Sequence, residues 1–73
     1  MEKSKRLKYE EAYMRKIRLL QTMQTEKGDQ AAIAHANSYK NWAIAQDNFK
    51  KDIELQGMHD ACERFLTDNN ATL

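Results

Sequence analysis

Proline is absent from the 73-residue chain, and glycine occurs only at positions 28 and 57. Because these residues are the strongest helix breakers, almost the whole sequence is compatible with long helices. The single cysteine, Cys62, cannot form a disulfide within the chain, which excludes a small disulfide-stapled scaffold. A dominant charge is also lacking, since 12 Lys and Arg face 11 Asp and Glu.

Long apolar runs are missing as well. No stretch approaches the ~18 consecutive apolar residues that a membrane-spanning helix requires. The N-terminal region shows no basic start followed by an apolar core and a small-residue cleavage site, so no signal peptide is expected. The sequence therefore predicts one small cytoplasmic domain over residues 1–73, without membrane contact.

Apolar residues recur at three- and four-residue steps through most of the chain, which is the spacing of one face of an α-helix. A first helix is predicted over about residues 4–27, where Tyr13 and Ile17 lie on the apolar face. Gly28 would end this helix, and Asp29 would serve as the N-cap of the next one.

A second helix is predicted over about residues 29–56, and its apolar residues occupy two nearly opposite sides. Such a helix is usually buried on both sides, so the side that the first helix leaves open needs a third helix or a second subunit. Gly57 leaves two alternatives, because the second helix either ends there or continues through it at a cost of about 1 kcal/mol. The pattern beyond predicts a third helix or a continuation over about 58–68, and a frayed tail over 69–73.

These elements predict the all-α class: an antiparallel helical hairpin, with a short third helix as an alternative. Because 73 residues bury only a thin core, we expect self-association into a helical bundle, as a homodimer. One packed interface is predicted to comprise Tyr39, Trp42, Phe49 and Ile53. A second interface, between subunits, is predicted to comprise Ile44, Leu55, Met58, Phe65 and Leu66.

Basic residues are concentrated in the first part of the chain. Residues 1–27 contain eight basic and four acidic side chains, whereas residues 28–73 contain four basic and seven acidic ones. An acidic protein or the phosphates of a nucleic acid could contact such a surface. The chain as a whole is nevertheless less basic than dedicated nucleic-acid-binding proteins. The residues predicted to form this surface are Lys5, Arg6, Lys8, Arg15, Lys16 and Arg18.

Residues suited to metal binding or catalysis are few. His59, Cys62 and Glu63 stand at i, i+3 and i+4, and all three side-chain types bind zinc. A structural zinc site needs four ligands, so we interpret Cys62 as a small buried hydrophobe and His59 as a surface residue. A Cys–His nucleophile pair would need an orienting group and an oxyanion hole, for which a small helical chain has little room. His35 is interpreted as a packed histidine with one satisfied nitrogen.

The favoured function is regulation or adaptation by contact with another protein, without enzyme activity and without a cofactor. Small size and the lack of catalytic motifs are also typical of accessory proteins of phages and mobile elements. The alternative is a nucleic-acid-associated modulator that uses the basic face of the first helix. The two differ in salt dependence, because phosphate contacts weaken steeply as the salt concentration rises.

Overall fold

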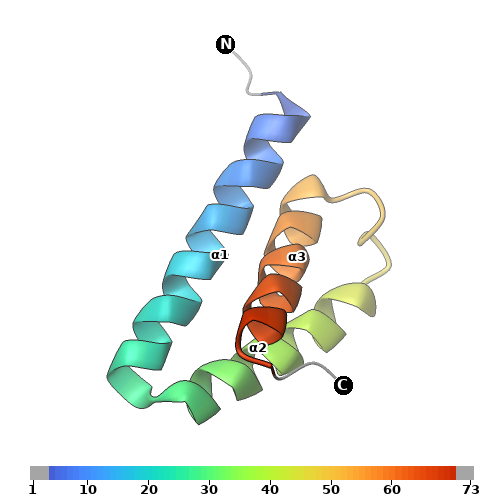
Figure 1. Ribbon diagram of the computed structural model, residues 1–73. Helices are drawn as coiled ribbons and strands as arrows, with labels where there is room; N and C mark the ends of the chain where they lie inside the picture. Colours follow the sequence, from blue (N-terminus) through green and yellow to red (C-terminus); the bar gives the residue numbers. More distant parts are fainter. Residues whose placement is uncertain (1–3, 71–73) are drawn as a thin grey trace.

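The computed structural model describes residues 4–70, which form three helices (Figure 1). Helix α1 spans Lys5–Lys27, α2 spans Asp29–Ile44 and α3 spans Ile53–Asp68. Helix α3 contacts both other helices and packs more extensively on α1 than on α2. The all-α prediction is confirmed, and the third helix is an element of its own.

The ends of α1 follow from local sequence. Ser4 is the N-cap, and its hydroxyl accepts a hydrogen bond of 3.1 Å from the backbone N–H of Leu7. Gly28 ends the helix with a φ of 96°, and its N–H donates to the carbonyl of Gln24. Glycine adopts this φ without the steric cost that a Cβ would bring. Both ends agree with the predicted helix to within about one residue.

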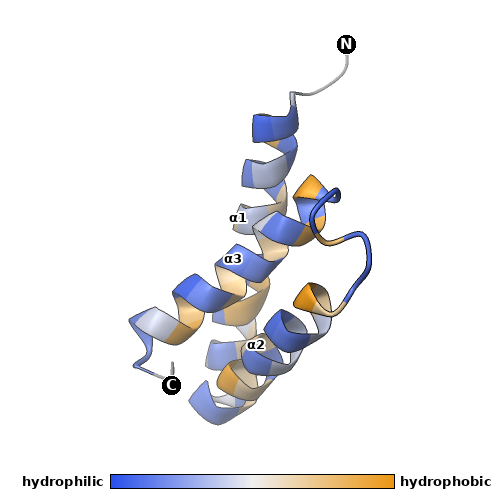
Figure 2. Ribbon diagram, turned by 90° about the vertical axis from the view of Figure 1, so that its right-hand side faces the viewer, coloured by the Kyte–Doolittle hydropathy of each residue, from blue (hydrophilic) through white to orange (hydrophobic). Residues whose placement is uncertain are grey.

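The helix predicted over 29–56 is wrong in its second half, because α2 ends at Ile44 and a hydrophilic loop follows (Figure 2). Within the loop, the carbonyl of Asn48 accepts from the N–H groups of Lys51 and Asp52, each at 2.9 Å. Asp52 then caps α3, its carboxylate accepting at 3.1 Å from the N–H groups of Glu54 and Leu55. Asn and Asp favour such local bonds over a continuous helix.

Gly57 neither ends α2 nor lies within a longer version of it. It is buried inside α3, at the point where α3 lies against the backbone of α1. A Cβ at this position would lie 2.6 Å from the carbonyl oxygen of Tyr9 and 3.3 Å from the backbone nitrogen of Tyr13. The two helices therefore approach as closely as a hydrogen atom at position 57 allows.

The core lies where the three helices meet and contains few large side chains. Leu20 of α1 and Leu66 of α3 are fully buried, and Phe65 is nearly so. They form a cluster with Ala32 and Ala36 of α2, whose small side chains let the helices pack closely. The alanine-rich sequence of α2 thus contributes to close packing.

Asn69, the first residue of the predicted frayed tail, is held by side-chain hydrogen bonds. Asn69, which follows α3, is half-buried. Its side-chain amide donates to the carbonyl of Phe65 at 2.8 Å and accepts from Gln24 of α1 at 2.9 Å. These bonds attach the end of α3 to α1, and the last part of the predicted tail, 71–73, lies outside the described residues.

The Gly57→Ala variant tests the close approach of α1 and α3. Alanine is the better helix former by about 1 kcal/mol, yet its methyl group would meet the backbone of α1. We expect a net loss of about 1–3 kcal/mol in the free energy of unfolding, as for other overpacked sites. Urea unfolding followed by circular dichroism measures this. The control is Thr67→Ala at an exposed position of α3, which should leave the free energy of unfolding unchanged. Equal stability of the two variants would contradict the close contact of Gly57 with the backbone of α1.

Candidate functional site

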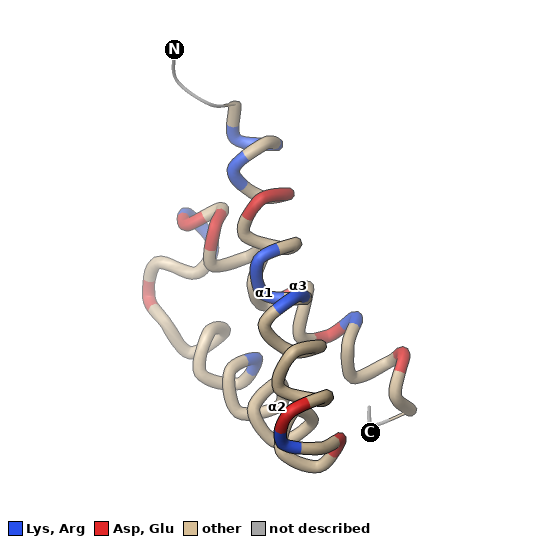
Figure 3. The backbone as a smooth tube through the Cα atoms, turned by 90° about the vertical axis from the view of Figure 1, so that its left-hand side faces the viewer, with Lys and Arg blue, Asp and Glu red and all other residues tan. Residues whose placement is uncertain are grey.

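Five of the six residues predicted to form a basic surface are exposed on α1. They are Lys5, Arg6, Lys8, Arg15 and Arg18. Figure 3 shows that acidic segments interrupt the basic ones along this helix. Arg6 also forms an ion pair of 3.1 Å with Glu10 one turn later. The surface is therefore of mixed charge along its length.

Lys16 is the exception, and its assignment to the basic surface is wrong. Only 6% of the residue is exposed. Its Nζ lies 3.0 Å from Nε2 of His35 and 3.7 Å from the centroid of the Tyr39 ring. An ammonium group only donates, so His35 accepts through Nε2 while the Tyr39 ring faces the cation. This agrees with the interpretation of His35 as a packed histidine with one satisfied nitrogen.

Burial sets the protonation of this pair. Desolvation lowers the pKa of Lys16, and the neighbouring Cys62 opposes that shift. Desolvation, followed by the charge of Lys16, lowers the pKa of His35. The neutral imidazole is therefore the form that fits beside the lysine.

The helical position of Lys16 indicates its burial, although its charge favoured the basic surface. It stands three residues after Tyr13 and four before Leu20, so it lies on the apolar face of α1. A long aliphatic stem can occupy such a place while its amine finds a polar partner. The helical position, rather than the residue type, indicates its burial.

A row of aromatic rings follows one side of α2. The rings of His35 and Tyr39 are stacked at 6.2 Å, and those of Tyr39 and Trp42 lie 5.4 Å apart. The Tyr39 hydroxyl donates to the sulfur of Met58 at 3.4 Å. Tyr39 is thus held by contacts to α1 and α3, and it supports Trp42, which remains 53% exposed.

The exposed surface of α2 is uncharged beyond its first residue. The residues concerned are Gln30, Ala34, Asn37, Ser38, Asn41, Trp42 and Ile44. Lys40, the one lysine of this helix, is half-buried. In a chain in which 32% of residues are charged, this surface differs from that of α1 (Figure 3).

The residues assigned to a contact between subunits are mostly covered within the chain. Leu55, Phe65 and Leu66 are buried, and the last two belong to the core cluster. Met58 is half-buried. Of that predicted interface only Ile44 is exposed, at 54%. The assignment of the buried residues to a second subunit is corrected, because the loop after Ile44 returns α3 onto the chain's own helices.

His59 is buried rather than on the surface, which corrects the prediction. Its Nδ1 lies 3.0 Å from Asp60, its Nε2 lies 3.8 Å from Glu63, and Phe49 meets its ring edge-on at 5.1 Å. The hydroxyl of Tyr9 donates to the second oxygen of Asp60. This bond, followed by burial, raises the pKa of Tyr9 to about 12. The group connects α1, the loop and α3.

Within residues 4–70, His59, Asp60 and Glu63 are the side chains whose ligand atoms lie close enough together, within 4.8 Å, to hold a metal ion. The two carboxylates approach opposite nitrogens of the ring. Cys62 does not join this group, because it is fully buried in the core. Burial raises the pKa of its thiol to about 11, which keeps it protonated and poorly nucleophilic at neutral pH.

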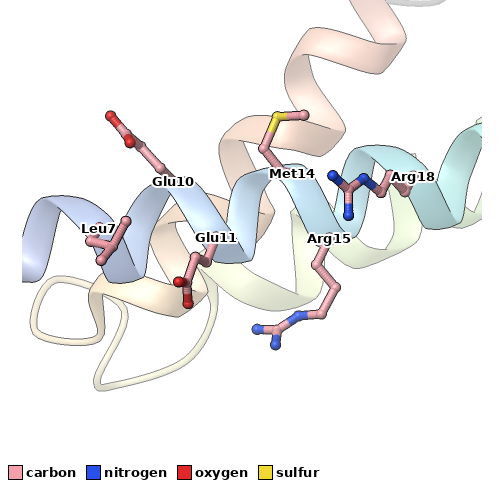
Figure 4. Close-up of a pocket in the computed structure, with 6 residues that line it drawn as sticks. All are labelled: Leu7, Glu10, Glu11, Met14, Arg15 and Arg18. Atoms are coloured by element: carbon pink, nitrogen blue, oxygen red, sulfur yellow. The ribbon is translucent and has the colours of Figure 1, made fainter. Parts of the chain in front are cut away.

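A shallow pocket lies on the side of α1 that faces away from the core (Figure 4). We call this the outer face of α1 and define it by its lining residues. They are Leu7, Glu10, Glu11, Met14, Arg15 and Arg18. Leu7 and Met14 are 42% and 47% exposed, so this face offers two large apolar side chains to a neighbouring molecule.

Comparison of the chain with protein-family models, with curated proteins and with solved structures finds no match. Across the described residues, no helix combines the length and the apolar character that crossing a membrane requires. Evidence for a function therefore comes from the surfaces and the buried groups themselves.

The His35→Gln variant tests the buried pair, because a glutamine oxygen can still accept from Lys16. The unperturbed histidine pKa is 6.5, and the folded-state pKa is lower. Below about pH 6.5 the unfolded chain therefore binds a proton that the folded chain resists, so acid reduces the free energy of unfolding. We expect the wild type to lose more stability than the variant between about pH 7.5 and about pH 5.5. Urea unfolding at both pH values measures the difference, and equal losses would contradict it.

Proposed function

We propose that this protein is a non-catalytic adaptor that binds another protein through uncharged exposed side chains of α2, with Trp42 as the main contact. The observation that carries the proposal is the exposure of Trp42, 53%, on a helix whose exposed side chains beyond Asp29 carry no charge. The cores of protein interfaces are depleted of charge and enriched in aromatic residues. Tryptophan is also among the residues that most often dominate binding energy.

The support beneath Trp42 favours binding. Tyr39 packs against the indole and is itself in contact with Lys16 and Met58. A side chain held in place before binding loses less conformational entropy when a partner covers it. The partner expected from this chemistry is a protein with an apolar pocket that accepts an indole, rimmed by groups that can bond to Asn and Ser side chains.

Nucleic-acid contact is the second candidate function, and the exposed cations of α1 favour it. Among the described residues, no ion pair forms at Lys5, Lys8 or Arg18. The burial of Lys16 and the acidic residues between the basic ones weaken this candidate. Phosphate neutralisation depends on a continuous basic track, which α1 interrupts at Glu10 and Glu11.

The Trp42→Ala variant tests the adaptor proposal. Partners captured by the wild-type chain from the cells that produce it are identified, and their affinity for purified variants is measured. We expect Trp42→Ala to weaken binding about 30-fold or more, the size of an interface hot spot. The matched control is Leu19→Ala, which truncates an exposed apolar side chain on α1.

Two outcomes would contradict the adaptor proposal: equal affinity of the Trp42→Ala and wild-type chains, or an equal loss for Leu19→Ala. The folded state of Trp42→Ala is checked by circular dichroism and urea unfolding. Because the indole is half exposed, we expect its removal to change the free energy of unfolding by no more than about 1 kcal/mol.

A salt titration tests the second candidate. If α1 binds phosphates, the affinity for a short duplex should fall steeply with salt, and Arg15→Gln combined with Arg18→Gln should reduce that slope. If no binding is detected at low salt, nucleic-acid contact is excluded as the function of this surface.

A further inference from the structure

The outer face of α1 is an exposed helix surface with two apolar side chains one heptad apart. Leu7 and Met14 lie on the side of the helix opposite the buried residues Ala12, Lys16 and Leu20. Figure 4 shows these side chains projecting from α1, and Met14 also borders a second pocket that residues of α3 help to line. Residues seven apart return to the same side of a helix, which is the repeat by which paired helices contact each other.

The charges on this face are ordered along the helix axis. The acidic residues Glu10 and Glu11 come first, Met14 follows, and the basic residues Arg15 and Arg18 come last (Figures 3 and 4). A second copy of α1 laid on the face in the parallel direction would place acid against acid and base against base. A copy laid in the antiparallel direction would place each acidic pair against a basic pair.

We propose that two copies of this chain associate through the outer face of α1, with the two helices antiparallel and Met14 close to the twofold axis. Met14 lies next to the midpoint between Glu11 and Arg18. When the two copies of Met14 meet, Glu11 of each copy therefore lies against Arg18 of the other. Leu7 of each copy then lies near Gln21 and Thr22 of the other. The surface is self-complementary, as a twofold interface must be.

The interactions already present within the chain are compatible with this arrangement. Arg6 pairs with Glu10 at 3.1 Å, but both side chains are largely exposed. Glu11 also interacts within its own chain. Exposed ion pairs contribute little and are readily shared. The order of charges along the face therefore selects the direction of the second copy, while Leu7 and Met14 supply the apolar contact.

This interface is distinct from the surface proposed to bind a partner. It lies on α1, whereas Trp42 lies on α2, so the two proposals succeed or fail separately. Only two apolar side chains per copy are buried, which predicts a weak dimer that dissociates on dilution. Because charge pairs orient it, we also expect it to weaken as salt screens them.

Sedimentation velocity over a concentration series tests the association. We expect a reversible monomer–dimer equilibrium in the wild type. Two charge-reversal variants, Glu10→Lys with Glu11→Lys and Arg15→Glu with Arg18→Glu, should each raise the dissociation constant about tenfold or more, since attractive pairs become repulsive ones. An equimolar mixture of the two variants should recover association. Trp42→Ala is the control and should dimerise like the wild type.

Cysteine cross-linking tests the direction. Met14→Cys lies near the twofold axis and should form a covalent dimer on mild oxidation. Leu7→Cys should not cross-link to itself but should cross-link to Thr22→Cys in a mixture. The wild type is the control, because its Cys62 is fully buried. Cross-linking of Leu7→Cys to itself would show a parallel pair and overturn the antiparallel arrangement.

Three results would overturn the interface as a whole. A wild-type chain that stays monomeric at every concentration has no self-association to explain. A dimer that both charge reversals leave intact uses another surface. Failure of the mixed reversals to associate, with both variants shown to be helical by circular dichroism, excludes the charge pairing and leaves the face for a partner of different sequence.

Discussion

The close approach of α3 to α1 at Gly57 is the constraint on which the rest of the structure depends. The missing side chain lets α3 lie against the backbone of α1 at Tyr9 and Tyr13. Helix α3 can then bury Phe65 and Leu66 against both other helices. Because the inner sides of α1 and α2 are covered in this way, only the outer sides of these two helices remain available to other molecules.

Polar contacts supplement a core that contains few large side chains. Lys16 reaches His35 and the ring of Tyr39, and Tyr9 bonds to Asp60 across α1 and α3. The first of these groups has a further consequence, because it holds Tyr39 beneath the exposed Trp42. The outer surfaces differ in chemistry: α2 exposes uncharged side chains, whereas α1 exposes ordered charges. An antiparallel dimer through α1 would therefore carry two separate α2 surfaces.

Features that depend on neighbouring residues in the chain were predictable. The all-α class follows from the composition, and the limits of α1 follow from Ser4 and Gly28, whose roles are local. The break after Ile44 was not found, because apolar residues continue on both sides of it with helical spacing. A search for N-caps would have found the signal at Asp52, where a short carboxylate precedes an amphipathic segment.

By itself, the sequence determined that the chain is helical, where α1 begins and ends, and which residues of each helix are apolar, because propensity, capping and periodicity act over a few residues. Only the tertiary structure decided that Gly57 is a contact, that Lys16 is buried, and that Leu55, Phe65 and Leu66 are covered by the chain itself. Those outcomes depend on which helices pack against each other. The loop at 45–52 determines this arrangement, because it returns α3 onto α1. The same apolar stripe serves a subunit contact or an internal core according to the direction in which the chain turns.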